Sequence, residues 1–288
     1  MDFLYHFIPN KVMFSIFNIN IYWYGFFIFC GAILGFLIFY KLAKKEKIQE
    51  KDIYDIFFYC FLFGIIGARL GYFFYDIQYY MQDPLAIFRF WEGGMSIIFG
   101  IISGIATLYI ICKKRKIELM KILNILPIPI LVAQILGRLG NYFNQELFGI
   151  PTSFFLKIPI QENLRPEQYK NETFFTPLFL YEIIFNIILL IILSLLLRKK
   201  YKNNLENGII SKELKAKDFR KSMNLLAFID KGGIILIYIN YYFILRFILE
   251  FFRIGEPKVL FLTLNQLLSI IVLVIFNIFW FRKNEKRA

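Results

Sequence analysis

The sequence predicts an all-α integral membrane protein with about seven transmembrane helices and a small extracytoplasmic cap. Three observations predict this class: 58% of the 288 residues are hydrophobic, the mean hydropathy is +0.58, and seven apolar stretches could each cross a bilayer. A hydrocarbon core needs about 20 helical residues. No repeat, linker or low-complexity segment divides the chain, so we expect one polytopic domain over residues 1–288.

The predicted spans lie near residues 19–40, 54–75, 94–112, 119–138, 178–197, 233–252 and 265–281. The first has no small-residue cleavage site near it and is expected to be a retained anchor. Pro127 and Pro129 interrupt the fourth, so we expect a kinked or broken helix there. Glycine pairs four residues apart, Gly31/Gly35, Gly67/Gly71 and Gly100/Gly104, indicate close helix packing.

The basic residues set the predicted orientation. Of the 34 lysines and arginines, 24 fall in residues 41–53, 113–121, 198–231 and 282–287, and the alternate segments hold seven. The positive-inside rule then places the amino terminus outside and the carboxyl terminus in the cytoplasm. The net charge of +13 follows from this bias and from attraction to anionic headgroups, so no nucleic-acid partner is expected.

Two polar excursions join the spans. Residues 141–177 contain four prolines and are long enough for a small structured cap on the outside. Residues 198–231 form a basic cytoplasmic loop, which we expect to be partly helical and to lie on the inner leaflet.

The chain gives no sign of metal or redox chemistry. Cys30, Cys60 and Cys112 lack CxxC spacing and have no histidine nearby, so they are interpreted as small buried hydrophobes. The only histidine is His6, which is expected at the surface. No metal and no cofactor are therefore expected.

Arginines in or beside the spans carry the functional signal. By the predicted topology, Arg69, Arg138, Arg246 and Arg253 all lie towards the outer half of the bilayer, where an ionisable residue marks a functional site by default. Too few acids accompany them, so they imply an anion, most simply a phospholipid phosphate that guanidinium groups bind bidentately. For Arg246 and Glu250, four residues apart, a structural ion pair is the alternative.

Other polar residues gather near these arginines in the sequence. Arg138, Asn141 and Gln145 would share one face if the helix continues past residue 140. Gly93 and Gly94 precede the third span, where backbone amides could approach a phosphate.

These motifs resemble those of the bacterial phosphatidylglycerol:prolipoprotein diacylglyceryl transferases. The stretch from Gly137 to Gly149 is similar to the long family signature G-R-x-G-N-F-x-N-x-E-x-x-G, which is highly specific. Shorter similarities follow the expected order: Trp23-Tyr24-Gly25, Gly67-Ala68-Arg69-Leu70-Gly71-Tyr72, Asp83-Pro84-Leu85, Trp91-Glu92-Gly93-Gly94-Met95-Ser96, Leu180-Tyr181-Glu182 and Arg246-Phe247-x-x-Glu250-Phe251-Phe252-Arg253.

The resemblance implies a plasma-membrane enzyme that moves the diacylglyceryl group of phosphatidylglycerol onto the lipobox cysteine thiol of a preprolipoprotein. Its partners would be phosphatidylglycerol and preprolipoprotein signal peptides, and we expect a monomer. The predicted catalytic residues are Tyr24, Arg138, Asn141 and Arg246, and the predicted substrate-binding residues are Arg69, Gly93, Gly94, Glu146, Gly149 and Glu250.

Roles follow for several of these residues. Arg138 and Arg246 would stabilise the leaving phosphate. Asn141 would bond phosphate or glycerol oxygens, and Gly149 would leave room for a lipid or peptide. Glu146 and Glu250 would orient the arginines.

Two departures from the family pattern leave alternatives open. The family's H-G-G histidine, proposed as the base for the thiol proton, is replaced by Ile98, and the histidine of H-P-S-Q-L-Y-E is replaced by Thr176. Either the thiolate forms without an imidazole, because arginines lower the pKa of a nearby thiol, or the chain is a catalytically altered paralogue that binds or translocates phospholipid. An ion-coupled transporter would show inverted repeats with paired broken helices, and none is visible in the sequence.

Overall fold

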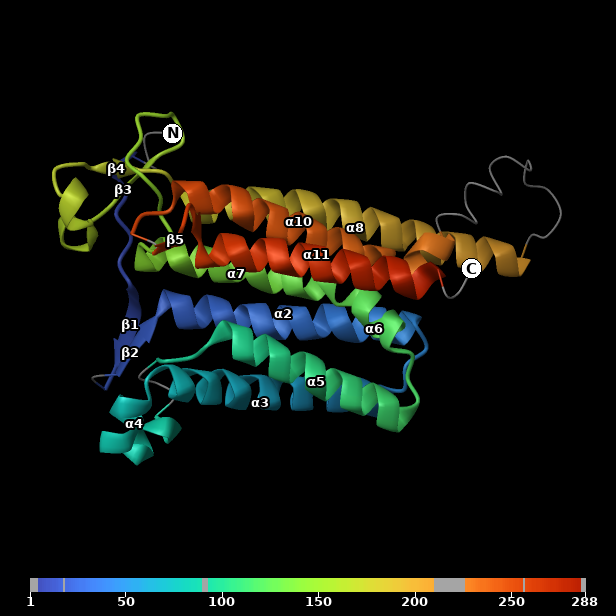
Figure 1. The fold of residues 1–288 in the computed structure, drawn as a ribbon. Helices are drawn as coiled ribbons and strands as arrows, with labels where there is room; N and C mark the ends of the chain where they lie inside the picture. The colour runs from blue at the N-terminus through green and yellow to red at the C-terminus, as the bar shows by residue number, and fades with distance from the viewer. Residues whose placement is uncertain (1–4, 18, 90–92, 210–225, 256, 286–288) are drawn as a thin grey trace. The chain divides into compact units, whose positions relative to one another are not determined.

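The computed structural model of the chain describes residues 5–17, 19–89, 93–209, 226–255 and 257–285. These residues include seven helices long and apolar enough to cross a membrane, which confirms the predicted fold class. In Figure 1 they are α2 (Trp23–Lys45), α3 (Glu50–Tyr75), α5 (Ile97–Arg115), α6 (Leu119–Ile125) continued by α7 (Pro127–Asn144), α8 (Leu178–Ile209), α10 (Gly233–Leu249) and α11 (Leu264–Glu285).

The chain forms two compact units, residues 40–122 and residues 1–39 with 123–288. In the larger unit α7 packs along α8, and α10 packs against α7, α8 and α11 (Figure 1). In the smaller unit α3 packs along α5. That all these elements form one domain stays a prediction.

The paired glycines pack helices together, as the sequence predicts. A Cβ on Gly31 of α2 would lie 3.3 Å from the Ala133 backbone of α7. A Cβ on Gly67 of α3 would lie 2.0 Å from the Ser103 hydroxyl of α5. Side chains at these positions would force the helices apart.

The first helix begins later than predicted. Residues 19–22 are predicted as part of the span, but Ile19–Tyr22 forms strand β2, which pairs antiparallel with β1 (Val12–Ile16). The sequence Ile-Asn-Ile-Tyr brings its side chains alternately to the two faces of a strand, a period of two that a hydropathy average does not detect.

The fourth span is broken where the sequence predicts. α6 ends at Ile125 and α7 starts at Pro127, which occupies the first turn of the new helix. Proline is tolerated there because the first-turn N–H groups have no partner within the helix. The helix then continues to Asn144, six residues beyond the predicted end.

The cap begins at residue 145 rather than at the predicted residue 141. Strand β3 (Ile158–Pro159) pairs with β4 (Phe174–Phe175), and the short 3-10 helices η3 (Glu162–Leu164) and η4 (Glu167–Tyr169) connect them. Ile158, Ile160 and Phe175 form one buried cluster with Phe179 and Ile183 of α8. This apolar cluster fixes the cap on the start of α8.

The predicted basic loop begins as helix. α8 continues to Ile209, and Lys200 on it pairs with Asp230 at 3.2 Å. Residues 210–225 of this loop, and Trp91 and Glu92 of the motif before α5, lie outside the described residues.

Candidate active site

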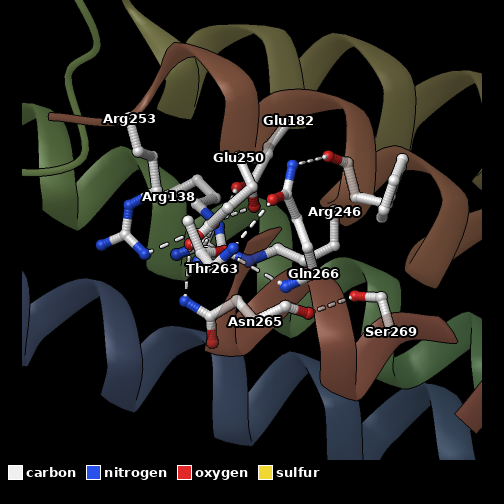
Figure 2. A network of polar contacts seen from close by, with 10 residues as sticks. Arg138, Glu182, Arg246, Glu250, Arg253, Thr263, Asn265, Gln266 and Ser269 are labelled. Carbon is white, nitrogen blue, oxygen red and sulfur yellow. Dashed lines mark hydrogen bonds and ion pairs between the residues drawn. The ribbon is translucent and has the colours of Figure 1, made fainter. Parts of the chain in front are cut away.

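Three arginines surround two glutamates where α7, α8 and α10 meet (Figure 2). Arg138 of α7 pairs with Glu182 of α8, and Arg246 of α10 reaches the other Glu182 oxygen at 3.4 Å. Glu250 follows α10 in the 3-10 helix η5 (Glu250–Phe252) and lies 3.1 Å from Arg246 and 3.6 Å from Arg253. The two carboxylates therefore join the three cations into one cluster.

The carboxylates are more deeply buried than the guanidinium groups. The side chains of Glu182 and Glu250 are 5% and 0% exposed, whereas those of Arg138, Arg246 and Arg253 are 23%, 17% and 23% exposed. The three guanidinium groups are therefore the more accessible charges of the cluster, and the two carboxylates are the buried ones. An arrangement of this kind favours an anion in front of the arginines.

The same geometry confirms the predicted ion pair between Arg246 and Glu250. It does not reduce the site to a structural pair, because Arg246 also contacts Glu182. A buried charge normally has a partner whatever its role. The pairing therefore explains how the guanidinium is held in an apolar region.

Asn141 extends the cluster towards the cap. Arg138 Nη1 donates to Asn141 Oδ1 at 3.2 Å, and Asn141 Nδ2 donates to Glu146 Oε2 at 3.3 Å. Asn144 Nδ2 donates to the other Glu146 oxygen at 3.2 Å. Glu146 thus orients Asn141 and Asn144, whereas the sequence predicts that it orients the arginines.

Tyr24 lies at the amino-terminal end of α2 against α7. A Cβ on Gly140 would be 2.7 Å from the Tyr24 ring, so this glycine permits the contact. A cavity of about 450 Å³ opens beside Tyr24 and is lined by Lys11, Gly25 and Asn144 among others. Asn144 connects this cavity to the carboxylate that orients Asn141.

Side chains at the start of α11 and just before it contact Glu250 (Figure 2). Asn265 Nδ2 donates to Glu250 Oε1 at 2.8 Å, and Thr263 Oγ1 donates to the same oxygen at 3.2 Å. Thr263 and Gln266 form a capping box, in which the Gln266 N–H donates to Thr263 Oγ1 at 3.2 Å and the Thr263 N–H donates to Gln266 Oε1 at 2.9 Å. The helix start is therefore built to face the carboxylate.

The backbone packing around residue 149 requires a glycine there. A Cβ at this position would lie 2.5 Å from the Phe252 carbonyl oxygen, and Gly149 pairs with Arg253 in an isolated β-bridge. This bridge joins the cap to the segment that carries Arg253. The predicted contact of Gly149 with substrate stays a prediction.

Arg69, Gly93 and Gly94 belong to the smaller unit and contact one another there. The Arg69 guanidinium, which is buried, donates to the carbonyls of Gly93 and Gly94 and to those of Ala86, Ile87 and Arg89. This clamp holds the segment that follows α4 (Ile77–Gln82), including the 3-10 helix η1 (Pro84–Phe88).

The two glycines present carbonyls rather than amides to this arginine. Gly93 and Gly94 have φ angles of 83° and 70°, and α5 starts three residues later at Ile97. The glycines precede the helix, as predicted, but the helix begins at Ile97 and not at the predicted residue 94, because left-handed backbone cannot be part of a right-handed helix. Between the glycines and α5, the Ser96 N–H donates to the Ala68 carbonyl of α3 at 2.9 Å. Phosphate binding by Arg69 and the glycines stays a prediction.

Gln145 does not share a helical face with Arg138 and Asn141. It has a φ of 52° and ends α7, so its side chain turns into the cap. There its amide donates to the Pro159 carbonyl at 3.2 Å and accepts from the Gln161 N–H at 2.9 Å. The helical spacing failed here because the helix stops one residue earlier.

Two site residues were missed as such by the sequence analysis, Glu182 and Asn265. Glu182 is the only acid within the apolar part of α8, and an acid in such a span is a signal that could have found it. The T-x-x-Q pattern at residues 263–266 marks a helix start, but nothing in it shows that Asn265 meets Glu250.

Comparison with known proteins agrees with these motifs. Residues 11–212 and 219–282 match the family described as prolipoprotein diacylglyceryl transferase. The chain is 37% identical over 205 residues to the phosphatidylglycerol--prolipoprotein diacylglyceryl transferase of a Synechococcus species, which covers 70% of this chain and 73% of that protein. It is 32% identical over 265 residues to the enzyme of the same name from Finegoldia magna, which covers 92% of each.

A third relative with this name, from Lactobacillus delbrueckii subsp. bulgaricus, is 28% identical over 268 residues, or 92% of this chain and 87% of that protein. The family match includes both halves of the arginine cluster, Arg138 with Glu182 and Arg246 with Glu250. By the extent of this match, the chain belongs to the prolipoprotein diacylglyceryl transferase family.

Proposed function

We propose that this chain transfers the diacylglyceryl group of phosphatidylglycerol to the lipobox cysteine thiol of preprolipoproteins. Family membership makes it a transferase, and with the seven apolar helices it indicates a multi-pass protein of the bacterial inner membrane. The observation that carries the proposal for the site is the partly exposed trio of Arg138, Arg246 and Arg253 in front of two buried carboxylates.

The reaction exchanges one bond for another. The cysteine sulfur forms a bond to the glyceryl carbon, the bond from that carbon to the phosphate oxygen breaks, and the electron pair leaves with glycerol phosphate. The thiol proton goes to water or to the leaving phosphate. Negative charge grows on the phosphate during this step, so fixed guanidinium groups stabilise the transition state more than the ground state.

In this proposal Arg138 and Arg246 bind the phosphate of phosphatidylglycerol. Their shared partner Glu182 keeps the two guanidinium groups at a fixed separation, and Glu250 fixes Arg246 from the other side. Charge-assisted bonds from guanidinium to phosphate are short and directional, so fixed donors suit a reacting phosphate.

Asn141 and Tyr24 bind neutral oxygens of the lipid. Asn141 is held by Arg138 and Glu146, which fixes the direction of its amide. Tyr24 is 37% exposed beside the cavity of about 450 Å³, where the glyceryl group or the lipobox peptide would lie.

The thiolate forms without an imidazole in this proposal. Ile98 is 50% exposed on α5, and His6, the only histidine of the chain, is exposed in the amino-terminal segment. Nearby cations lower the pKa of a thiol, and the three guanidinium groups are the accessible charges of the cluster.

The remaining features belong to the same proposal. The protein acts as a monomer, with the amino terminus and the cap outside and the carboxyl terminus in the cytoplasm, as the positive-inside rule predicts. Its second substrate is the lipobox region of the signal peptide, which reaches the site from the same membrane.

The test is a reaction with purified full-length protein, labelled phosphatidylglycerol and a lipobox peptide, followed by mass spectrometry of the peptide. The expected product carries a thioether-linked diacylglyceryl group. Arg246→Ala and Asn141→Ala should abolish it. Arg165→Ala is the matched control, because Arg165 lies in the cap and donates to the carbonyls of Ile160 and Lys170.

A catalytically altered paralogue would bind phosphatidylglycerol without producing the thioether. It would also tolerate substitution of Tyr24 and Glu146. Lipid binding without product, under conditions in which the Finegoldia magna relative forms product, would favour that alternative.

A further inference from the structure

A second, smaller cavity lies beside the arginine cluster and shares Glu250 and Arg253 with it. It has a volume of about 230 Å³, and its walls come from four parts of the larger unit, which are the cap, residues 250–255, residues 258–263 and Gln266 of α11. The cap contributes Gln168 and Tyr169, both of η4. The hairpin formed by β5 (Lys258–Val259) and β6 (Leu262–Thr263) contributes Lys258. None of these three residues belongs to the motifs of the sequence analysis.

The lining of this cavity combines cationic and polar side chains with the apolar Ile150, Phe251, Ile254 and Phe261. Among the described lining residues, Arg253 and Lys258 are cations and Glu250 is the one acid, already paired with Arg246 at 3.1 Å. Gln168 and Gln266 add amides that can donate and accept hydrogen bonds. Such walls suit a small anion that also carries hydroxyl groups.

The cavity is small. Pockets for drug-sized ligands have volumes of roughly 300 to 1,000 Å³. A cavity of about 230 Å³ is below that range, so its size suits a small molecule better than two acyl chains.

Glu250 connects the cavity to the proposed phosphate-binding arginines, because it lines the cavity and contacts Arg246. Glu250 lies between Arg246 at 3.1 Å and Arg253 at 3.6 Å, so the two guanidinium groups are neighbours of one anion (Figure 2). The Ile150 N–H donates to the Phe252 carbonyl at 2.9 Å, which fixes the backbone next to Arg253. Glu250 Oε2 occupies the space between the two guanidinium groups, and Arg253, the second of them, also lines this cavity.

We propose that this cavity binds the glycerol phosphate half of phosphatidylglycerol and selects the headgroup; this inference rests on the proposed function. Arg138 and Arg246 bind the phosphate during the reaction, Arg253 and Lys258 bind it after the bond to the glyceryl carbon has broken, and Gln168 and Tyr169 of the cap bond the glycerol hydroxyls. An ammonium headgroup, as in phosphatidylethanolamine, would meet two cations there and be repelled. Lys258 is therefore a specificity-determining residue.

The experiment compares Lys258→Glu with the wild-type protein. Transfer to a lipobox peptide is measured in mixed micelles of phosphatidylglycerol or phosphatidylethanolamine, and inhibition by sn-glycerol 1-phosphate and by inorganic phosphate is measured alongside. Lys258→Glu should shift the ratio of the two kcat/KM values towards phosphatidylethanolamine by about ten-fold and weaken inhibition by glycerol phosphate by a similar factor.

Two further variants complete the design. Lys170→Glu changes the charge by the same amount on the cap but outside this cavity, next to Glu167 at 3.9 Å, and should behave as wild type. Gln168→Leu should weaken inhibition by glycerol phosphate more than inhibition by inorganic phosphate, because only the former has hydroxyl groups for the amide.

The outcomes separate the two proposals. Unchanged lipid preference and unchanged inhibition in Lys258→Glu, with normal transfer from phosphatidylglycerol, would overturn the headgroup cavity and leave the transferase intact. A wild-type protein that forms no thioether at all would overturn the proposed function and this inference with it.

Discussion

Asn265 and Arg246 hold the two oxygens of one buried carboxylate. The Asn265 amide donates to Glu250 Oε1 at 2.8 Å, and the Arg246 guanidinium lies 3.1 Å from Oε2. Arg246 is thus fixed by the start of α11 through Glu250. The helix that contributes no charged residue to the cluster still determines where its central cation lies.

Asn265→Leu should therefore lower kcat by about ten-fold, since a hydrogen bond to a charged group contributes about 1.5 to 3 kcal/mol. KM for phosphatidylglycerol should change less, because the guanidinium remains present but less well directed. Ser269→Ala is the control, because the Ser269 hydroxyl donates to the Asn265 carbonyl within the helix and not to Glu250. Equal kinetics for both variants would remove Asn265 from the positioning role.

Glu182 supports two cations at once, so its neutralisation should cost both stability and activity. Glu182→Gln leaves Arg138 and Arg246 short of one negative charge in a buried place, and breaking a buried ion pair costs about 3 to 5 kcal/mol. We expect a clear fall in the thermal unfolding midpoint and about a 100-fold loss of turnover. Glu167→Gln, at a side chain 97% exposed in the cap, should leave both unchanged.

Gly149 and Gly25 should respond to alanine with opposite signs. Gly149→Ala brings a methyl group 2.5 Å from the Phe252 carbonyl, and a strained contact of this kind costs about 1 to 3 kcal/mol. Gly25 has nothing within 4 Å of its added Cβ, so Gly25→Ala in helix α2 should stabilise by up to about 1 kcal/mol. Chemical unfolding of both variants in one detergent measures the difference. Equal stability would mean that the backbone contact at Phe252 does not restrict residue 149.

The sequence predicts those contacts of the site that join residues of the same helix, and not the contacts between helices. Arg246 and Glu250 were paired from their spacing of four residues, and the spans were found from hydropathy. Glu182 and Asn265 come to the site by tertiary packing of α8 and α11, which no local period encodes. Gln145 was misplaced for a local reason: a residue other than glycine with positive φ ended the helix, and such residues are uncommon.

Arg69 offers a separate test, because its role can be structural or ligand-binding. Arg69→Lys keeps the charge but loses the planar fork that reaches five carbonyls, among them Ile87 at 3.0 Å and Arg89 at 3.0 Å. We expect faster amide hydrogen exchange in residues 84–89 while exchange in α3 is unchanged. Weaker phosphatidylglycerol binding with unchanged exchange would instead support the predicted contact of Arg69 with substrate.

The pH dependence of transfer tests how the thiol loses its proton. The family histidine is replaced by Ile98, and His6 lies exposed in the amino-terminal segment. A free cysteine has a pKa of about 8.5, so below that value the thiolate fraction rises about ten-fold per pH unit.

Because a thiolate is the nucleophile and no imidazole supplies a fixed pKa near 6.5, log kcat/KM should rise with a slope of about one between roughly pH 6 and 7.5. The arginine cluster acts on the thiol only in the bound complex, so it changes the pH dependence of kcat and not that of kcat/KM. His6→Ala should give the same profile as wild type. A plateau beginning near pH 6.5 would require a base of that pKa in the site, and the proposal of transfer without an imidazole would then be wrong.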